Sequence, residues 1–270
     1  MKMKKIALPK KLVAVGDVHG RYDALRKVVD EKLLEQGYRY VFLGDYLGYG
    51  DQSAKVLKYL VGLKARLPRQ IFLLFGNWEK LVYQAIYAKE KLHRDAAVQK
   101  IVQRGWLHGF EEFKKDKEAC SIVKNFIQIL DMGFYEGTYC FTHAGVDPAL
   151  LQGKIMPLPE IIYGSSINHL LWNFEFSAQM RNVRTPYTFI VGHRAVQNLA
   201  KDATKVVPFV EGSVVTIDFG AAKESGYLGY IRFDEAGRIS FAKTPVLAPT
   251  PTDKVVIPSE SKPATVQKTA

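Results

Sequence analysis

Cysteine is scarce in this sequence, and long apolar runs are missing. Only Cys120 and Cys140 occur among 270 residues, and their spacing fits neither a zinc knuckle nor a redox pair. No segment approaches the roughly 18 uninterrupted apolar residues of a membrane helix. The N-terminal residues are basic, as in a signal peptide, but no apolar stretch long enough for one follows, because the chain continues with Pro9, Lys10 and Lys11. We therefore expect a cytoplasmic protein of a reducing compartment, with no membrane partner.

Acidic residues are fewer than basic ones. The chain has 27 Asp and Glu against 38 Lys and Arg, a formal net charge of +11. This excess favours acidic ligands such as phosphate compounds, although a basic balance alone bears only on solubility and non-specific association. We expect residues 1–10 to form a basic N-terminal extension that solvates the terminus. Nucleic acid is not an expected partner, and the sequence leaves the oligomeric state open.

Three segments of the N-terminal half share one pattern. In each, a short apolar run ends in Gly and a polar residue before a helical pattern begins: Lys11 to Asp17, Tyr40 to Asp45 and Ile71 to Asn77. The pattern predicts a βαβαβ unit. Because the apolar runs do not alternate strictly, we expect a largely parallel sheet with buried strands and helices outside it. Polar groups at the carboxyl ends of such strands converge on one edge, where ligands bind.

The rest of the chain divides into a helical stretch, a strand-rich half and a tail. The charged helical pattern of residues 79–131 predicts a helical insert. Later apolar runs predict strands at 134–142, 187–191, 205–210, 214–219, 227–233 and 238–242. We expect one α/β domain over residues 11–242, with two mixed β-sheets packed as a sandwich and flanked by helices. Residues 243–270 lack periodicity, which predicts a disordered tail.

Six polar residues stand at or just after predicted strand ends. They are Asp17, His19, Asp45, Asn77, His143 and His193. Two carboxylates, one amide oxygen and three imidazoles suit manganese, iron or zinc, which accept mixed oxygen and nitrogen ligands. A single ion does not need six ligands. If Asp45 bridges two ions about 3.5–4 Å apart, they can share a hydroxide and clamp both the attacking and departing oxygens of a phosphoryl group.

Each of these residues also has an ordinary structural interpretation. A lone histidine such as His143 or His193 is more often a satisfied structural group than a ligand. Asp17 or Asp45 alone can cap the helix that follows it. The occurrence of all six in this order favours the metal site. The other histidines lack a strand-end glycine, so we assign them to the insert or the surface: His93, His108 and His169.

Four segments carry a resemblance to a known family. Residues 44–53, GDYLGYGDQS, parallel the pattern G-D-Y-V-D-R-G-P-Q-S, and residues 76–79, GNWE, parallel G-N-H-E. Residues 171–173, LWN, precede the last His motif, and residues 217–221, IDFGA, parallel I-D-T-G-A. Over roughly residues 11–242 the sequence thus resembles the calcineurin-like metallophosphoesterases. It is most similar to their branch of bacterial and phage-type Ser/Thr protein phosphatases and diadenosine tetraphosphatases.

The resemblance implies a sandwich of two mixed sheets flanked by helices and a binuclear metal centre. The implied ligands are Asp17, His19 and Asp45 for the first ion, and Asp45, Asn77, His143 and His193 for the second. We expect two divalent ions, with manganese as the first choice and iron or zinc as alternatives. The residues to which we assign catalytic roles are Asp45, His143 and Arg194.

Four positions outside the metal ligands depart from the family pattern. In the family, the His of G-N-H-E protonates the leaving oxygen and the Asp of D-R-G orients that His; here these positions hold Trp78 and Gly48. The joint loss favours an adapted site over scattered damage. The phosphate-binding arginines of the family correspond to Tyr49 and Phe174.

These departures bear on the substrate. General acid catalysis is worth about 10² to 10⁴ in rate, so its loss hurts serine phosphates most and aryl esters or anhydrides less. Loss of bidentate arginines weakens selection for a phosphomonoester dianion. The candidate replacements are Arg21, Arg181, Arg184 and Arg194. We favour Arg194 because it directly follows His193. Trp78 and Tyr49 either stack on a base or aryl group of the substrate or serve ordinary packing.

The ligand set and these departures are compatible with three functions. The leading hypothesis is a metal-dependent hydrolase of phosphate esters that resembles Ser/Thr protein phosphatases and acts on a phosphorylated protein, nucleotide or small molecule. The second is a phosphodiesterase or dinucleoside-polyphosphate hydrolase, which the missing acid favours. The third is a phospholigand-binding protein that keeps its metals without turnover.

Overall fold

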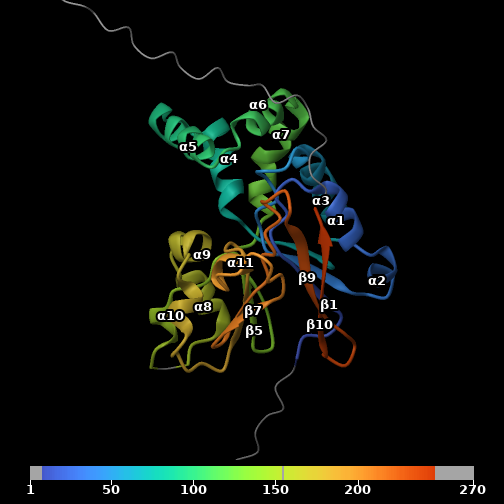
Figure 1. Cartoon of the computed structure of the whole chain (residues 1–270), viewed down its shortest axis with the longest axis vertical. Helices are drawn as coiled ribbons and strands as arrows, with labels where there is room; N and C mark the ends of the chain where they lie inside the picture. The colour runs from blue at the N-terminus through green and yellow to red at the C-terminus, as the bar shows by residue number, and fades with distance from the viewer. Residues whose placement is uncertain (1–7, 154, 247–270) are drawn as a thin grey trace, which may run out of the picture.

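The computed structural model describes residues 8–153 and 155–246, and its strands form two mixed five-stranded sheets (Figure 1). The first sheet has the order β10-β9-β1-β2-β3, with β1 at Leu12–Val15, β2 at Arg39–Phe42, β3 at Ile71–Leu73, β9 at Tyr227–Phe233 and β10 at Ile239–Pro245. The second has the order β4-β5-β6-β8-β7, with β4 at Phe134–Glu136, β5 at Tyr139–Thr142, β6 at Thr188–Val191, β7 at Phe209–Glu211 and β8 at Val214–Thr216.

Strands β1, β2 and β3 form the predicted parallel unit. β1 pairs with β2 in parallel, and β2 pairs with β3 in parallel. Parallel neighbours need crossover connections, which are helical here. These helices are α1 at Tyr22–Val28 and α2 at Glu31–Glu35 between β1 and β2, and α3 at Ser53–Arg66 between β2 and β3. All of β1 is buried, as expected for a strand covered on both faces.

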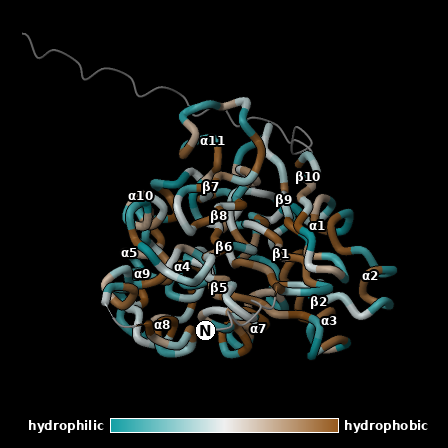
Figure 2. Tube along the Cα trace, turned by 90° about the horizontal axis from the view of Figure 1, so that it is seen from below, coloured by the Kyte–Doolittle hydropathy of each residue, from teal (hydrophilic) through white to brown (hydrophobic). Residues whose placement is uncertain are grey.

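Successive residues of β1 face opposite layers. Val13 and Val15 belong to an apolar cluster shared with α1 and α3, whereas Leu12 and Ala14 belong to one shared with Phe141 and other residues of the second sheet. A third cluster lies between the second sheet and helices α8 at Leu158–Gly164, α9 at Ile167–Trp172 and α10 at Phe176–Met180. The two sheets thus pack face to face between helical layers (Figure 2), which confirms the predicted sandwich.

Helices follow β3 at one end of the molecule, within the predicted insert (Figure 1). They are α4 at Asn77–Tyr87, α5 at Lys91–Gln103, α6 at Leu107–Lys115 and α7 at Lys117–Phe126. Val82, Ile101 and Phe110 join the same apolar cluster as α3, so these helices share one core with the first sheet. Short helical turns stand elsewhere: η1 at Ile127–Ile129, η2 at Pro148–Leu151 and α11 at Val196–Leu199. The division into residues 1–10, 11–242 and 243–270 stays a prediction.

Element boundaries differ from the sequence prediction at several points. The single strand predicted over 134–142 is a hairpin of β4 and β5, because Gly137 turns the chain with a φ of 59°. The strand predicted over 205–210 occupies Phe209–Glu211 instead. β10 continues past 242 to Pro245, because its pairing with β9 extends to Pro245↔Tyr227. The rest of the predicted tail, 247–270, and residues 1–7 lie outside the described residues.

None of the helices described for residues 8–153 and 155–246 combines the length and hydropathy needed to span a membrane.

Candidate metal centre

The predicted ligands lie where strands end or in the turns that follow. Asp17 and Asp45 follow β1 and β2, and Asn77 begins α4 after β3. His143 directly follows β5, and His193 lies two residues after β6. These strands run parallel within each sheet, so their carboxyl ends open toward a common edge. The structure brings the side chains together at that edge.

These side chains form two groups that share Asp45. The first group is Asp17, His19 and Asp45, and the second is Asp45, His143 and His193. In each group, one potential ligand atom per residue lies within 4.8 Å of the others. Asn77 joins the second group, since its Oδ1 lies 3.0 Å from Nε2 of His143. The other histidines lie on separate helices: His93 on α5, His108 on α6 and His169 on α9.

Backbone carbonyls orient two of the imidazoles. Nδ1 of His143 lies 2.9 Å from the Leu43 carbonyl oxygen, and Nδ1 of His19 lies 3.1 Å from that of Leu47. A proton on Nδ1 satisfies each carbonyl and leaves Nε2 as the free ligand atom. The Nε2 atoms then face Asp45, at 3.8 Å for His19 and 3.5 Å for His143.

His193 supplies evidence that the site fits a cation. Its backbone N–H donates to both carboxylate oxygens of Asp17, at 3.0 and 3.1 Å. Its Nε2 is buried and has no hydrogen-bond partner within the described part of the chain. Burial, together with the positive charge of Arg104, lowers the pKa of His193 to about 3. The imidazole is therefore neutral at pH 7, and a bound ion would satisfy its unpartnered nitrogen.

The electrostatics of the carboxylates agree with this interpretation. Burial raises the pKa of Asp17 and Asp45 well above the ordinary value, and the negative charges of Asp218 and Glu79 add to the respective shifts. Burial also lowers the pKa of His19 to about 4, so this imidazole supplies no compensating charge at pH 7. A cluster of buried carboxylates with neutral imidazoles is the donor set that divalent manganese, iron or zinc accepts.

Three of the six residues have strained backbone. His19, Asp45 and His193 adopt φ values of 47°, 51° and 66°, in the left-handed region that disfavours side chains. Such strain costs on the order of 1–3 kcal/mol per residue and is found mostly at functional sites. Close approach also requires glycine nearby, since a Cβ on Gly76 would lie 2.1 Å from the Asp45 nitrogen.

Glu79 fixes the loop that carries Asp45. Its buried carboxylate accepts N–H groups of Asp45 at 2.9 Å, Tyr46 at 2.8 Å, Leu47 at 3.2 Å and Gly76 at 3.1 Å. Burial raises its pKa to about 7, while these hydrogen bonds act in the opposite direction. Glu79 was given no role on sequence grounds, although it is the last residue of the GNWE segment.

The centre lies in a cleft of about 310 Å³ that also contains residues not predicted from the sequence. Its lining includes Arg104, Asp218 and Lys223. Burial raises the pKa of Asp218 to about 6, and one of its oxygens accepts the Gly220 N–H at 2.8 Å. Phe174 is 48% exposed and lines the cleft, with its ring 4.3 Å from the imidazole of His193 between centroids.

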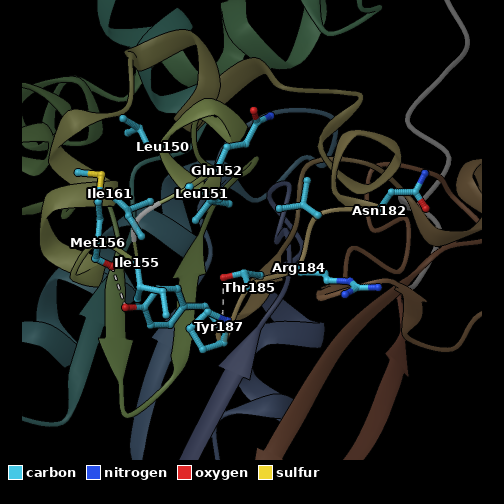
Figure 3. A pocket seen from close by; sticks show the side chains of 13 residues that line it. Leu150, Leu151, Gln152, Ile155, Met156, Ile161, Asn182, Arg184, Thr185 and Tyr187 are labelled. Atoms are coloured by element: carbon cyan, nitrogen blue, oxygen red, sulfur yellow. Dashed lines mark hydrogen bonds between the residues drawn. The ribbon is translucent and has the colours of Figure 1, made fainter.

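A second cavity, of about 380 Å³, lies apart from this centre (Figure 3). The loops around η2 and before β6 line it, and Arg184 lies at its edge across from Met156. The Tyr187 hydroxyl donates to the Met156 carbonyl oxygen at 2.7 Å. Its described lining holds no carboxylate or imidazole, so the smaller cleft is the candidate site.

Comparisons with known proteins agree with this geometry. The sequence pattern described as calcineurin-like phosphoesterase matches residues 10–217. The chain belongs to the calcineurin-like phosphoesterase family. This membership confirms the expected family.

Individual relatives of this phosphoesterase share the fold or a segment of sequence. A PP2A-like Ser/Thr protein phosphatase, PPG1 of Candida albicans, is 36% identical over 74 residues, 27% of this chain and 18% of that protein. A structure assigned as a diadenosine tetraphosphatase has a TM-score of 0.54 at 17% identity, covering 86% of this chain and 92% of that one. A Ser/Thr phosphatase structure of Saccharomyces cerevisiae, similar to human PP5, also has a TM-score of 0.54. Its identity is 14%, and the match covers 89% of this chain and 81% of that one. These two structures support the fold.

In this phosphoesterase, Trp78 occupies space that a side chain at position 48 would need. Gly48 has a φ of 95°, and a Cβ on it would lie 2.7 Å from Cδ2 of the indole. Trp78 is only 2% exposed and packs in the core, and it also lines the cleft. Tyr49 packs edge-on against Trp78 at 4.9 Å and against His19 at 5.0 Å between centroids.

The candidate replacement arginines have other partners. Nε of Arg21 donates to the Ala221 carbonyl at 3.0 Å, and Arg181 pairs with Glu211 at 2.7 Å. Arg184 lines the second cavity.

Arg194 is also engaged outside the main cleft. It donates to the Phe174 carbonyl at 2.6 Å and lies 3.3 Å from Glu175. It lines a small cavity together with Phe174 and His193. Its assignment to catalysis stays a prediction.

Proposed function

We propose that this phosphoesterase hydrolyses phosphate esters with two divalent cations bound at the cleft. The proposed ligands are Asp17, His19 and Asp45 for one ion, and Asp45, Asn77, His143 and His193 for the other. The observation that carries the proposal is the position of Asp45, which belongs to both groups of potential ligand atoms. We propose manganese as the natural metal, with iron or zinc as alternatives, and a cytoplasmic location.

The chain's own residues position the reaction. Bound ions would supply a water of lowered pKa and neutralise charge on the phosphoryl group. The Trp78 backbone N–H donates to Oδ1 of Asp45 at 2.9 Å and so fixes the orientation of the shared carboxylate. His143 holds its proton at Nδ1 toward Leu43 and keeps Nε2 free. The proposed catalytic roles of Asp45 and His143 are therefore to position the reacting groups.

The proposed substrate class follows from Trp78, which occupies the position of the family's proton-donating histidine. With Trp78 packed over Gly48, the chain presents no imidazole there to protonate a departing serine oxygen. Aryl phosphates and phosphoanhydrides are cleaved without such help, because their leaving groups are weak bases and depart unprotonated. We propose that these are better substrates than phosphoserine peptides, by up to the 10²–10⁴ that general acid catalysis contributes.

Two other functions keep specific support. The absent acid also favours hydrolysis of aryl phosphodiesters or dinucleoside polyphosphates, because their leaving groups, an aryloxide or a phosphate, are weak bases that require less protonation. Tyr49 and Phe174 line the cleft where family members carry arginines, and this supports a phospholigand-binding protein without turnover as the third function.

A substrate panel separates these functions. Manganese-loaded protein would be given p-nitrophenyl phosphate, bis-p-nitrophenyl phosphate, a phosphoserine peptide and diadenosine tetraphosphate, with metal content measured in parallel. We expect turnover of the aryl monoester to exceed that of the peptide. Preferential turnover of the diester or tetraphosphate would support the second function, and bound metal without turnover of any panel member would support the third. Equal or faster turnover of the peptide would contradict the role given to Trp78.

A further inference from the structure

Arg104 stands where α5 ends and reaches the metal cleft. It is the C-terminal cap of α5, and Gly105, with a φ of 75°, turns the chain immediately after it. Arg104 lines the cleft together with the ligands Asn77 and His193. A residue of the helical segment thus enters a site whose ligands come from the strand ends.

The Arg104 guanidinium is supported without being neutralised. It lies over the Trp172 ring, 5.5 Å from its centroid. Within the described residues, its guanidinium has no ion pair with a carboxylate and donates no hydrogen bond. Stacking on an aromatic ring orients a guanidinium while leaving its N–H donors available. Arg104 therefore keeps both its charge and its donors for a ligand in the cleft.

Trp106 anchors this segment to the loop of Gly48 and Gly50, where the family's orienting aspartate is missing. Its indole N–H donates to the Gly50 carbonyl at 3.3 Å, and its ring stands edge-on to Trp78 at 5.5 Å between centroids. Trp106 is buried, and a Cβ on Gly109 would lie 2.1 Å from its Nε1, so this packing depends on glycine. The indole at position 78 is thus part of the packing that positions Arg104.

No other arginine in the described chain lines this cleft. Lys223 lines it too, but its Nζ lies 3.4 Å from Oδ1 of Asn198 and it offers a point charge. A guanidinium offers paired N–H donors that match two oxygens of a phosphoryl group. The position of Arg104 and the chemistry of its side chain therefore both fit a tetrahedral oxyanion.

We propose that Arg104 binds the non-bridging phosphoryl oxygens of the substrate and replaces the phosphate-binding cations absent at Tyr49 and Phe174. The inference rests on the proposed function in so far as the ligand is a phosphoryl group. It adds a specificity-determining residue from the helical segment. The aromatic residues Trp78, Trp106 and Trp172 then act together as its support.

Binding of inorganic phosphate to manganese-loaded protein tests this role separately from turnover. The variants are Arg104→Gln and, as a matched control, Lys100→Gln. Lys100 lies on the same helix over the same Trp172 ring, at 5.7 Å, and is not among the residues that line the cleft. We expect Arg104→Gln to raise the phosphate Kd and the KM for p-nitrophenyl phosphate about tenfold or more. Lys100→Gln should change either constant less than about twofold.

Arg104→Lys keeps the charge and most of the packing, and it should fall between wild type and Arg104→Gln. Metal content and thermal unfolding establish that each variant is folded and loaded. Unchanged phosphate affinity in folded, loaded Arg104→Gln, or an equal loss in Lys100→Gln, would overturn the role of Arg104. If wild type binds phosphate but turns over no substrate, the proposed hydrolysis fails, and the phosphate Kd of the variants still decides the role of Arg104.

Discussion

The indole of Trp78 leaves no room for a side chain at position 48, which holds Gly48. A Cβ on Gly48 would lie 2.7 Å from Cδ2 and 2.9 Å from Cε2 of the indole, closer than real Cβ atoms come to other heavy atoms. An orienting carboxylate at position 48 is therefore incompatible with Trp78 as packed here. The two departures from the family pattern are a single steric arrangement, which gives a physical reason for their joint occurrence.

Gly48→Ala should destabilise the protein by about 1–3 kcal/mol, because the added methyl meets the indole and the backbone φ of 95° disfavours a side chain. Urea unfolding of metal-loaded protein measures this. Gly62→Ala in α3 is the matched control: a Cβ there meets nothing within 4 Å, and alanine should stabilise the helix by up to about 1 kcal/mol. Equal stability of Gly48→Ala and wild type would refute the steric explanation.

Trp78→His alone should not restore rapid cleavage of a phosphoserine peptide. The new imidazole would have no carboxylate at Gly48 to orient it, so it would be a poor proton donor. The double variant Gly48→Asp, Trp78→His should turn over the peptide about 10² to 10⁴ times faster than the single variant. Turnover of p-nitrophenyl phosphate should respond much less. Full rescue by Trp78→His alone would show that the orienting carboxylate is not needed.

Glu79→Gln should destabilise the loop of Asp45 and weaken metal binding. The carboxylate accepts four backbone N–H groups, whereas a Gln amide has one acceptor oxygen and turns its NH₂ toward the others. We expect a loss of about 2–4 kcal/mol in unfolding free energy. Glu118→Gln removes a surface carboxylate that pairs with Lys58 and should cost less than about 1 kcal/mol. Similar losses in both variants would count against a central role for Glu79.

Metal affinity should rise with pH, with release of protons. Burial raises the pKa values of Asp17 and Asp45 above those of ordinary carboxyl groups, so these residues hold protons to higher pH and a cation must displace them. Burial lowers the pKa values of His19, to about 4, and of His193, to about 3, so their imidazoles are already free of protons at pH 7. Calorimetric titration of manganese in buffers of different ionisation enthalpy measures the protons released. Affinity independent of pH would contradict this assignment.

Local patterns in the sequence predicted the fold and the convergence of the candidate ligands on one edge. Apolar runs that end in glycine located β1, β2 and β3, and the polar residues after them lie at one edge because parallel strands share a direction. The end of β10 was not predictable in this way, since it depends on pairing with β9. Local pattern also joined β4 and β5 into one strand, because the turn at Gly137 is short.

The residues around the metal ligands were harder to predict. Arg104 reaches the cleft only because Trp106 packs on Trp78 and hydrogen-bonds the loop at Gly50, contacts between segments far apart in sequence. The role of Glu79 depends likewise on N–H groups from the loop of Asp45. Composition and periodicity carry no signal for either arrangement.

The metal content of Asp45→Asn tests the central claim most directly. Asp51→Asn is its matched control, the same chemical change on an exposed side chain six residues along the chain. Protein loaded with manganese, freed of excess metal and analysed by mass spectrometry should carry two ions per chain in wild type and Asp51→Asn. Asp45→Asn should carry none and should not hydrolyse p-nitrophenyl phosphate, because both ions depend on the shared carboxylate. Retention of both ions or of turnover by Asp45→Asn would contradict the two-metal account.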